Sequence, residues 1–383
     1  MKPDELRIAL FSGNYNYHRD GANQALNRLV GFLLRQGAKV RIYSPKVENP
    51  AFPATGDLVG VPSFPIPGRS EYRFAFRIPR SVRRDLADFN PNVVHVAAPD
   101  IVAHRAVSWA RHRRIPVISS VHTRFDTYLQ YYNLKWLEPV ARAIMRRYYR
   151  RCDAIVVPAE STAAIMGAQR MNRDISIWAR GVDREQFNPL RRSLEWRRAH
   201  GIGDEEMVVA FLGRLVLEKG LDVFSDAIEA ARDRNVPLRV VAIGDGPARD
   251  YFQERLPDAI FTGQLTGSEL ATALASTDVF LNPSITETFG NVTLEAMASG
   301  LPCVCADATG SSSLVVPGET GFLIPADNAD GFARQLTLLA QDTALRRRMG
   351  EAARARALTY SWEETLARIL GYYRALLAEA VRS

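Results

Sequence analysis

Short apolar runs alternate with polar and amphipathic segments along the first half of the chain. The runs read LRIALFS (6–12), AKVRIYSP (38–45), VVHVAAP (93–99), PVISSVH (116–122) and AIVVPA (154–159). Between the first two lies NQALNRLVGFLLRQG, residues 23–37, whose apolar positions have the spacing of one helix face. Apolar runs of this length, separated by polar or helical segments, are typical of buried parallel strands.

The alternation starts again in the second half. Its apolar runs read VVAFLGR (208–214), LRVVAIGDG (238–246), AIFTGQL (259–265), DVFLNPS (278–284) and PCVCADA (302–308). Two series of strand–helix units predict two doubly wound α/β domains. The joint is expected near residues 181–193, a polar segment that contains Pro189, and the segment 361–381 has the apolar spacing of a helix.

Composition narrows the class of protein. The chain has 383 residues, 47% of them hydrophobic, which is enough for two cores. No apolar run approaches the ~20 residues of a membrane-spanning helix, and the acidic start has no long apolar segment, so we expect no secretory signal. The three cysteines, Cys152, Cys303 and Cys305, form no metal-ligand pattern and suit a reducing compartment. These features predict a cytoplasmic protein.

Arginines dominate the net charge of +7 and gather in two stretches of the first half. Residues 69–84 hold six arginines with three aromatic residues and one acid, and residues 142–151 hold five arginines with two tyrosines and no acid. Basic, aromatic-rich segments can dock on anionic membranes, but each stretch could equally be a solvated helix face. No recognised nucleic-acid-binding motif accompanies the charge, so we expect no nucleic acid partner.

Ligands of doubly wound sheets bind where the strands end, so the residues after each strand are the candidates for chemistry. The first strand is followed by SGNYNYHRDGANQAL, which lacks the G-x-G-x-x-G pattern of dinucleotide-binding folds. Gly21, at the expected helix start, could let a phosphate approach the backbone or be a plain turn glycine. His122 ends a strand and could contact a sugar or act in acid–base chemistry, although a structural histidine is the alternative.

The loops of the second half are richer in candidates. Arg214 and Lys219, five residues apart in GRLVLEKG, could clamp a diphosphate between a guanidinium fork and an ammonium point charge. Gly244 belongs to a tight turn, GDG, that could let a ribose or a base lie close to the backbone. Glu287 and Glu295 flank a helix start in TETFGNVTLEAMASG, and the field of a helix N-terminus suits a bound phosphate. The chain has no D-x-D motif, so we expect no divalent metal.

The order of these loops resembles the retaining glycosyltransferases of the GT-B fold, family four of the sequence-based classification. The resemblance covers almost the whole chain and rests on the Gly21 loop, His122, GRLVLEKG, GDGP, FTGQLTGSEL and TETFGNVTLEAMASGLP, whose E-x7-E spacing is the most specific element. HTRFDTYLQYY (122–132) is similar to the branch of GDP-mannose-dependent α-mannosyltransferases and sulfoquinovosyl-diacylglycerol synthases. The loop after Asp307 departs from the family, which usually has Gly-Gly and a final acid where this chain has Thr309-Gly310 and Ser313.

The resemblance implies a domain plan and a set of site residues. It implies an acceptor-binding domain at 1–188, a nucleotide-sugar-binding domain at 189–360 and a C-terminal helix at 361–383 that packs on the first domain. Glu287 would hold the sugar hydroxyls, Glu295 the ribose hydroxyls, and Arg214 and Lys219 the leaving diphosphate. The implied donor contacts are Gly21, Gly213, Arg214, Lys219, Gly244, Glu287, Phe289, Gly290, Asn291, Val292 and Glu295. The implied catalytic residues are His122, Glu287, Arg214 and Lys219.

The implied reaction moves a hexose from a UDP- or GDP-linked sugar, with no other cofactor, to a lipid such as diacylglycerol at the inner face of a membrane. No carboxylate nucleophile is evident, and the resemblance implies transfer on one face of the sugar, with the leaving phosphate taking the acceptor's proton. The acceptor could instead be soluble or a polysaccharide precursor. A nucleotide-sugar epimerase of the same fold and a catalytically inactive sugar-nucleotide-binding subunit are further alternatives. The E-x7-E pattern disfavours the first, and the complete set of candidate residues disfavours the second.

Overall fold

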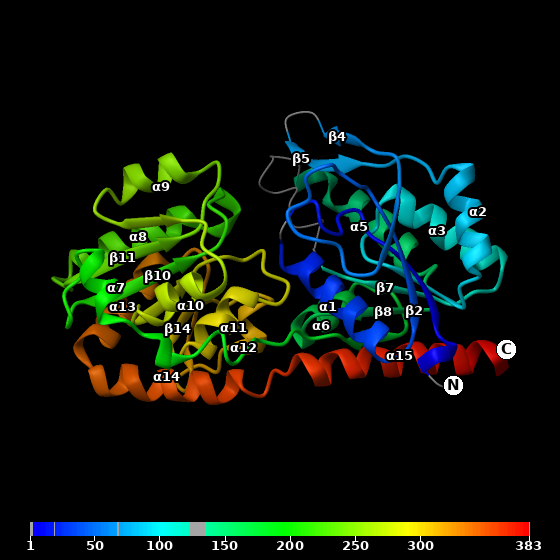
Figure 1. Cartoon of the computed structure of the whole chain (residues 1–383). Coiled ribbons are helices and arrows are strands. Elements are labelled where there is room, and N and C mark those ends of the chain that lie inside the picture. The colour runs from blue at the N-terminus through cyan, green and yellow to red at the C-terminus, as the bar shows by residue number, and fades with distance from the viewer. Residues whose placement is uncertain (1–2, 19, 67–68, 123–134, 383) are drawn as a thin grey trace. The chain divides into compact units, whose positions relative to one another are not determined.

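The chain folds into two compact α/β units. The computed structural model describes residues 3–18, 20–66, 69–122 and 135–382 (Figure 1). The first unit comprises Met1–Ala179 with Glu363–Ser383, and the second comprises Arg180–Trp362. Both contain a parallel sheet covered by helices, which confirms the predicted pair of doubly wound domains. The acceptor and donor roles expected for the two domains stay predictions.

The first unit is built on seven parallel strands in the order β3-β2-β1-β6-β7-β8-β9. The strands are β1 (Arg7–Phe11), β2 (Lys39–Ser44), β3 (Asp57–Gly60), β6 (Val93–Val96), β7 (Val117–Ser120), β8 (Ala154–Val157) and β9 (Ile175–Ile177). The five predicted runs form the interior strands. The edge strands β3 and β9 were not predicted, because they are short and only half-buried and so carry no continuous apolar run.

Over the described ranges, a hairpin and eight helical segments complete this unit. The hairpin pairs β4 (Phe64–Ile66) with β5 (Arg69–Phe74) in antiparallel register. The helices are η1 (Pro3–Glu5), α1 (Gly21–Arg35), α2 (Arg80–Phe89), α3 (Ile101–His112), η3 (Lys135–Leu137), α5 (Glu138–Tyr149), α6 (Glu160–Ala168) and α15 (Trp362–Arg382). From Glu363 onward α15 belongs to the first unit, and it buries Ile369, Tyr373 and Leu377 at helical spacing. Among the described residues, no helix is long and apolar enough to cross a membrane.

The second unit has six parallel strands in the order β12-β11-β10-β13-β14-β15. They are β10 (Met207–Leu212), β11 (Leu238–Ile243), β12 (Ile260–Gly263), β13 (Val279–Asn282), β14 (Cys303–Ala306) and β15 (Gly321–Ile324). The helices are η4 (Pro189–Arg191), α7 (Leu194–Ala199), η5 (Leu217–Lys219), α8 (Leu221–Arg232), α9 (Arg249–Arg255), α10 (Gly267–Ala275), α11 (Asn291–Ala298), α12 (Ser311–Leu314), α13 (Ala329–Gln341) and α14 (Thr343–Ala357). Phe211, Phe224 and Phe252 meet edge to face in its core, with centroids 5.4–5.6 Å apart.

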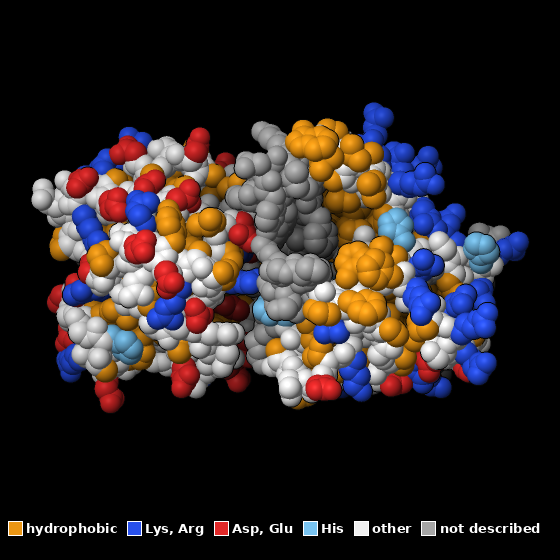
Figure 2. Space-filling view, turned by 90° about the horizontal axis from the view of Figure 1, so that it is seen from above, with side chains coloured by type: hydrophobic (Ala, Val, Ile, Leu, Met, Phe, Trp, Pro, Cys, Tyr) orange, Lys and Arg blue, Asp and Glu red, His pale blue; other side chains and the backbone are white. Residues whose placement is uncertain are grey.

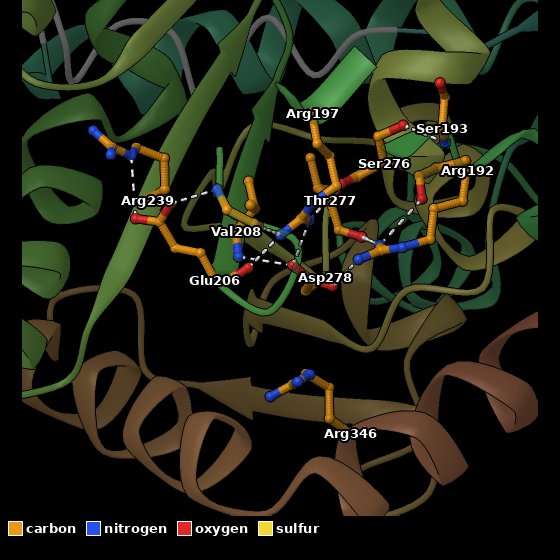
Figure 3. A network of polar contacts seen from close by, with 12 residues as sticks. Arg192, Ser193, Arg197, Glu206, Val208, Arg239, Ser276, Thr277, Asp278 and Arg346 are labelled. Carbon is orange, nitrogen blue, oxygen red and sulfur yellow. Dashed lines mark hydrogen bonds and ion pairs between the residues drawn. The ribbon is translucent and has the colours of Figure 1, made fainter. Parts of the chain in front are cut away.

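A buried ion-pair network fixes the amino-terminal edge of the second sheet (Figure 3). Arg197 is fully buried and donates to Asp278 Oδ2 at 3.1 Å and to the Ser276 carbonyl at 2.9 Å. Asp278 Oδ2 also accepts from the Val208 amide at 2.8 Å, so α7, β10 and the start of β13 are joined through one carboxylate. Ligands of parallel sheets bind at the opposite, carboxyl edge. We therefore assign this network to stability.

Candidate active site

Both sheets reverse their strand order beside their first strand. In the first unit the reversal lies between β1 and β6, and in the second it lies between β10 and β13. The loops that follow such neighbouring strands leave in opposite directions, which opens a crevice at the carboxyl ends where α/β folds bind ligands. The two reversals therefore locate the candidate site of each unit.

In the second unit this crevice brings Lys219 and Glu287 together. Lys219 ends η5, just after β10, and Glu287 lies in the loop after β13. Lys219 Nζ donates to Glu287 Oε1 in an ion pair whose side chains are 25% and 18% exposed. These two residues, which are 68 positions apart in the sequence and were predicted to belong to one donor site, are thus in direct contact. A partly exposed pair of this kind contributes little stability, so a ligand's hydroxyls and phosphates can replace the contact at low cost.

The loop after β14 contacts the main chain of Glu287 through a hydrogen bond and close packing. The Thr309 hydroxyl donates to the Glu287 carbonyl at 2.8 Å. A Cβ on Gly310 would lie 2.8 Å from Glu287 Cβ and 2.9 Å from the Phe289 carbonyl carbon, so only glycine fits. This chain therefore keeps the glycine that packing requires, and its threonine in place of the family's first glycine adds a hydrogen bond. The Ser313 carbonyl accepts from Arg356 Nη2 at 3.0 Å, which anchors the end of α12.

The segment after Glu287 forms the start of α11. Gly290 adopts a positive φ of 92° and precedes the first helical residue, Asn291. Phe289 is buried against Tyr360, with ring centroids 6.0 Å apart, so its side chain belongs to the core. Val292 and Glu295 are half-buried on the first turns of the helix. Any contact of Phe289, Gly290 or Val292 with a phosphate would thus go through the backbone, and such contacts stay a prediction.

The two glycine-rich turns of this unit pack directly on each other. A Cβ on Gly244 would lie 1.9 Å from the Gly213 carbonyl oxygen, and the Gly213 amide donates to the Ile243 carbonyl at 3.0 Å. On the other side of Arg214, the Leu215 amide donates to the Asp245 carbonyl at 3.0 Å. The backbone on both sides of Arg214 is therefore fixed, at Gly213 and at Leu215, by hydrogen bonds to the segment 243–245. The structure gives Gly213 and Gly244 this packing role, and a role in nucleotide binding stays a prediction.

In the first unit, His122 lies just beyond β7. Its Nε2 is 2.8 Å from Ser120 Oγ, and its ring meets Trp178 edge to face with centroids 5.5 Å apart. The sequence did not predict either neighbour, although Ser120, the last residue of β7, lies two positions before His122 and would share its face in an extended segment. The segment 123–132, with the tyrosines that supported the family branch, lies outside the described residues.

Gly21 is the first residue of α1, and that helix start already has an anion. The Asp20 carboxylate accepts from the Asn23 amide at 2.8 Å, and the Asn23 side chain accepts from the Asp20 amide in return. Burial raises the pKa of Asp20. A phosphate at Gly21 would have to share the helix N-terminus with this carboxylate, and the predicted contact remains untested.

A small recess, open to solvent at its mouth, lies at the strand reversal of the first unit. It is lined by Ser12, Gly13, Tyr43, Pro45, Val61, Arg73, Phe74, Ala75, Asp100, Ile101 and Val102. Asp100 Oδ1 accepts from the Ala103 amide at 2.7 Å, and a Cβ on Gly13 would lie 2.9 Å from Asp100 Oδ2. Arg73 is anchored to Ser63 Oγ at 2.9 Å through Nε. Sequence reasoning missed Asp100, although its place after the run VVHVAAP fits the rule that located the other candidates.

The surface of the first unit carries apolar side chains bordered by basic ones (Figure 2). Trp136, Val140 and Ile144 are 72%, 55% and 58% exposed, and Arg147 continues the same helix face. On the hairpin, Phe64, Phe74 and Phe76 are exposed and contact one another. We call Trp136, Val140, Ile144 and Arg147 the α5 stripe. The prediction rested on the arginines and tyrosines of residues 142–151 and did not include this apolar part.

The described residues contain no group of three or more His, Cys, Asp or Glu side chains arranged to hold a metal ion.

Comparison with known proteins gives consistent matches over both units. The family model described as Glycosyltransferase Family 4 matches residues 19–186, and that described as Glycosyl transferases group 1 matches residues 193–356. A GDP-mannose-dependent alpha-mannosyltransferase of Mycolicibacterium smegmatis is 33% identical over 97% of this chain and 98% of its own. Sulfoquinovosyl transferase SQD2 of Arabidopsis thaliana is 31% identical over 96% of this chain and 74% of its own.

Two further matches extend the range of relatives. An alpha-monoglucosyldiacylglycerol synthase of Streptococcus pneumoniae is 24% identical over 78% of this chain and 70% of its own. The solved structure of sucrose-phosphate synthase from Thermosynechococcus elongatus matches 98% of this chain and 100% of its own, with a TM-score of 0.80 and 20% identity. At that identity the second match shows a shared fold, the two-domain α/β fold predicted from the sequence.

Proposed function

The chain belongs to the glycosyltransferases of family 4, and from this premise we propose that it transfers a hexose, with retention, from a nucleotide sugar to a lipid acceptor at a membrane surface. The enzyme class and the use of a nucleotide sugar follow from the family and confirm the prediction. The UDP or GDP carrier, the sugar, the lipid and the cytoplasmic face of the membrane belong to the proposal. GDP is favoured by the GDP-mannose-dependent relative, which aligns over nearly the whole of both chains.

The contact between Lys219 and Glu287 carries the proposal for the donor. A carboxylate can accept from two neighbouring sugar hydroxyls in charge-assisted hydrogen bonds, and an ammonium displaced from that carboxylate can turn to a diphosphate oxygen. Arg214 would add a guanidinium fork from its anchored loop. Charges held in place before the reaction stabilise the negative charge that grows on the leaving diphosphate. In this proposal no metal ion takes part.

The chemistry proposed at the sugar needs no covalent intermediate. The bond from the anomeric carbon to the phosphate oxygen breaks, and the bond to the acceptor oxygen forms on the same face. The acceptor's proton passes to the leaving phosphate oxygen, so the balance needs no separate base. His122 would help to position the sugar. Water must be kept from the reacting carbon, since it would compete as acceptor.

The recess of the first unit supports an uncharged polyol as the acceptor group. Arg73 and Asp100 both line it, and within the described residues no ion pair joins them. A hydroxyl pair could donate to the carboxylate and accept from the guanidinium, whereas an anionic group would face the Asp100 carboxylate. Val61, Phe74 and Ile101 give the recess an apolar wall. A glycerol group attached to acyl chains combines both properties, and a relative named for monoglucosyldiacylglycerol adds support.

A transfer assay with two panels tests this proposal. Purified protein is incubated with UDP- and GDP-linked hexoses and with vesicles that contain diacylglycerol, and glycolipid is measured by mass spectrometry. The expected result is one preferred donor and a lipid product that Asp100→Asn reduces, with donor hydrolysis unchanged, because asparagine keeps the helix cap. Transfer only to soluble sugars would disprove the proposal of a lipid acceptor. An epimerised donor without any transfer would refute the proposed reaction.

A further inference from the structure

A chain of hydrogen bonds joins α15 to His122 through the interior of the first unit. The Tyr373 hydroxyl lies 2.5 Å from His95 Nδ1, and His95 Nε2 lies 2.8 Å from Ser120 Oγ. Ser120 Oγ in turn lies 2.8 Å from His122 Nε2. Tyr373, His95 and Ser120 are buried, and the ring of Trp178 meets both histidines, with centroids 6.1 and 5.5 Å away.

The state of His95 limits how this chain can be arranged. Complete burial lowers the pKa of His95 to about 3, so its ring is neutral. A neutral imidazole has one N–H donor and one acceptor nitrogen. His95 therefore donates at one ring nitrogen and accepts at the other. The Ser120 hydroxyl could accept from both histidines, but its own proton would then have no acceptor in the interior, because within the described residues its hydrogen-bond partners are His95 and His122. The three hydrogen bonds therefore run in one direction: either Tyr373 donates at one end and His122 accepts at the other, or all three are reversed.

The tyrosine end decides between the two directions. Within the part of the chain that the structure describes, His95 is the hydrogen-bond partner of the Tyr373 hydroxyl, and the tyrosine is fully buried. If His95 donated to that hydroxyl, the tyrosine proton would be left without an acceptor in the interior, which is unfavourable. If Tyr373 donates, every donor and acceptor in the chain is satisfied. Burial also raises the pKa of Tyr373, which keeps its proton in place.

We propose that Tyr373, His95 and Ser120 are positioning residues that hold His122 neutral, with Nε2 as the acceptor and the proton on Nδ1. A ring in this form carries its N–H at Nδ1, and its Nε2 is occupied as the acceptor from Ser120 and so does not act as a general base. The importance of this for transfer rests on the proposed function, but the position of the proton does not. The C-terminal helix thereby reaches a predicted active-site residue.

Nitrogen NMR of the full-length protein tests the position of the proton. With ¹⁵N-labelled histidine and the His122 signals assigned by their loss in His122→Asn, we expect a protonated Nδ1 and an unprotonated Nε2. Tyr373→Phe removes the terminal donor and keeps the ring, so both tautomers of His122 should then be populated. Tyr372→Phe is the matched control, because its hydroxyl donates to the Ile177 carbonyl at 3.3 Å, outside this chain.

Kinetics test the effect on transfer. Tyr373→Phe should lower kcat about fivefold with little change in the donor KM, the size expected for one neutral hydrogen bond. His95→Gln can still accept from Tyr373 and donate to Ser120, so it should retain more activity than His95→Phe. Thermal unfolding of each variant separates these effects from loss of fold.

A protonated Nε2 on His122 in the unmodified protein would overturn the proposal. So would an unchanged tautomer in Tyr373→Phe. If no donor is turned over by the unmodified protein, the proposed function fails, while the NMR result still decides the direction of the hydrogen bonds.

Discussion

The ion pair of Lys219 with Glu287 makes a prediction about single side chains. Glu287→Ala and Lys219→Ala should each lower kcat about 100-fold, because each would remove one of the proposed charged contacts with the donor, and such a contact is worth roughly 3 kcal/mol in a closed site. Steady-state transfer assays and thermal unfolding measure this. Glu319→Ala, which changes an exposed acid near β15, is the control and should leave the rate unchanged. Near-normal turnover in either folded site variant would disprove the assignment of the site.

The two cations of the candidate site, Arg214 and Lys219, predict that the reaction tolerates chelation of metal ions. In the proposed site Arg214 and Lys219 would supply the positive charge that a metal ion would otherwise bring to the leaving diphosphate, so the rate in excess EDTA should match the rate without it. The assay uses protein dialysed against EDTA, with magnesium and manganese added back. A loss of activity that either ion restores would contradict this.

The close packing of Gly310 against the Glu287 loop predicts that added volume at this position lowers the rate of transfer. In Gly310→Ala the new methyl group would press on Glu287 and Phe289, with contacts of 2.8 and 2.9 Å. A shift of the Glu287 loop by even part of an ångström should cost at least about tenfold in kcat, since catalysis depends on near-ideal placement. Gly371→Ala is the control: nothing lies within 4 Å of its added Cβ, and alanine favours the helix α15 by about 1 kcal/mol. Equal rates in the two variants would show that the Glu287 loop can move freely.

At the scale of elements, the network around Arg197 predicts a loss of stability without a loss of chemistry. Arg197→Met would remove the fully buried partner of Asp278, which keeps Arg192 as a second partner at 2.8 Å, and should lower the free energy of unfolding by about 3 kcal/mol. Arg198→Met is the control: it breaks the exposed ion pair between Arg198 and Asp204 and should change the free energy of unfolding little. Chemical denaturation measures both. Since the network lies at the amino edge of the sheet, the folded fraction of each variant should keep its donor KM.

The elements that the sequence predicted are those in which local pattern and burial agree. The interior strands, α1 and the C-terminal helix each have a continuous apolar run or a clear helical face. The edge strand β15 begins at Gly321, where the backbone approaches β14 so closely that a Cβ would lie 1.9 Å from the Cys303 carbonyl oxygen. Such a strand depends on tertiary contact, and its sequence shows a turn rather than a strand.

The site residues were predictable for a similar reason and to a similar extent. Lys219 and Glu287 follow strands that the sequence located, and the resemblance gave their order, so their contact could be anticipated. Asp100 follows a predicted strand and fits the same rule, but its place at the strand reversal depends on β6 lying beside β1. Tyr373 could not be anticipated, because it belongs to a helix at the far end of the chain. Strand order and long-range packing decide both, and a local pattern contains neither.

The whole molecule makes its own prediction through the surface of the first unit. The arginines at 142–151 are not equivalent: Arg142 pairs with Glu138, and Arg146 and Arg150 donate to the carbonyls of Gln169 and Arg170. Substituting all of them would therefore disturb the fold as well as the charge. The α5 stripe gives a sharper test, because Val140 and Ile144 are exposed and Arg147 lies on the same helix face.

We expect the protein to float with vesicles containing an anionic lipid at low salt, and not with neutral vesicles. A basic residue near an anionic surface contributes about 1 kcal/mol, which salt screens within a Debye length of about 10 Å at 0.1 M. Ile144→Ser with Arg147→Gln should therefore reduce vesicle binding about tenfold or more, since it removes one charge and one apolar anchor. Leu338→Ser with Arg334→Gln removes an exposed apolar residue and one charge from the second unit and is the matched control. If the unmodified protein ignores anionic vesicles at low salt, or if both variants lose binding equally, the α5 stripe does not dock on membranes and a soluble acceptor becomes the better hypothesis.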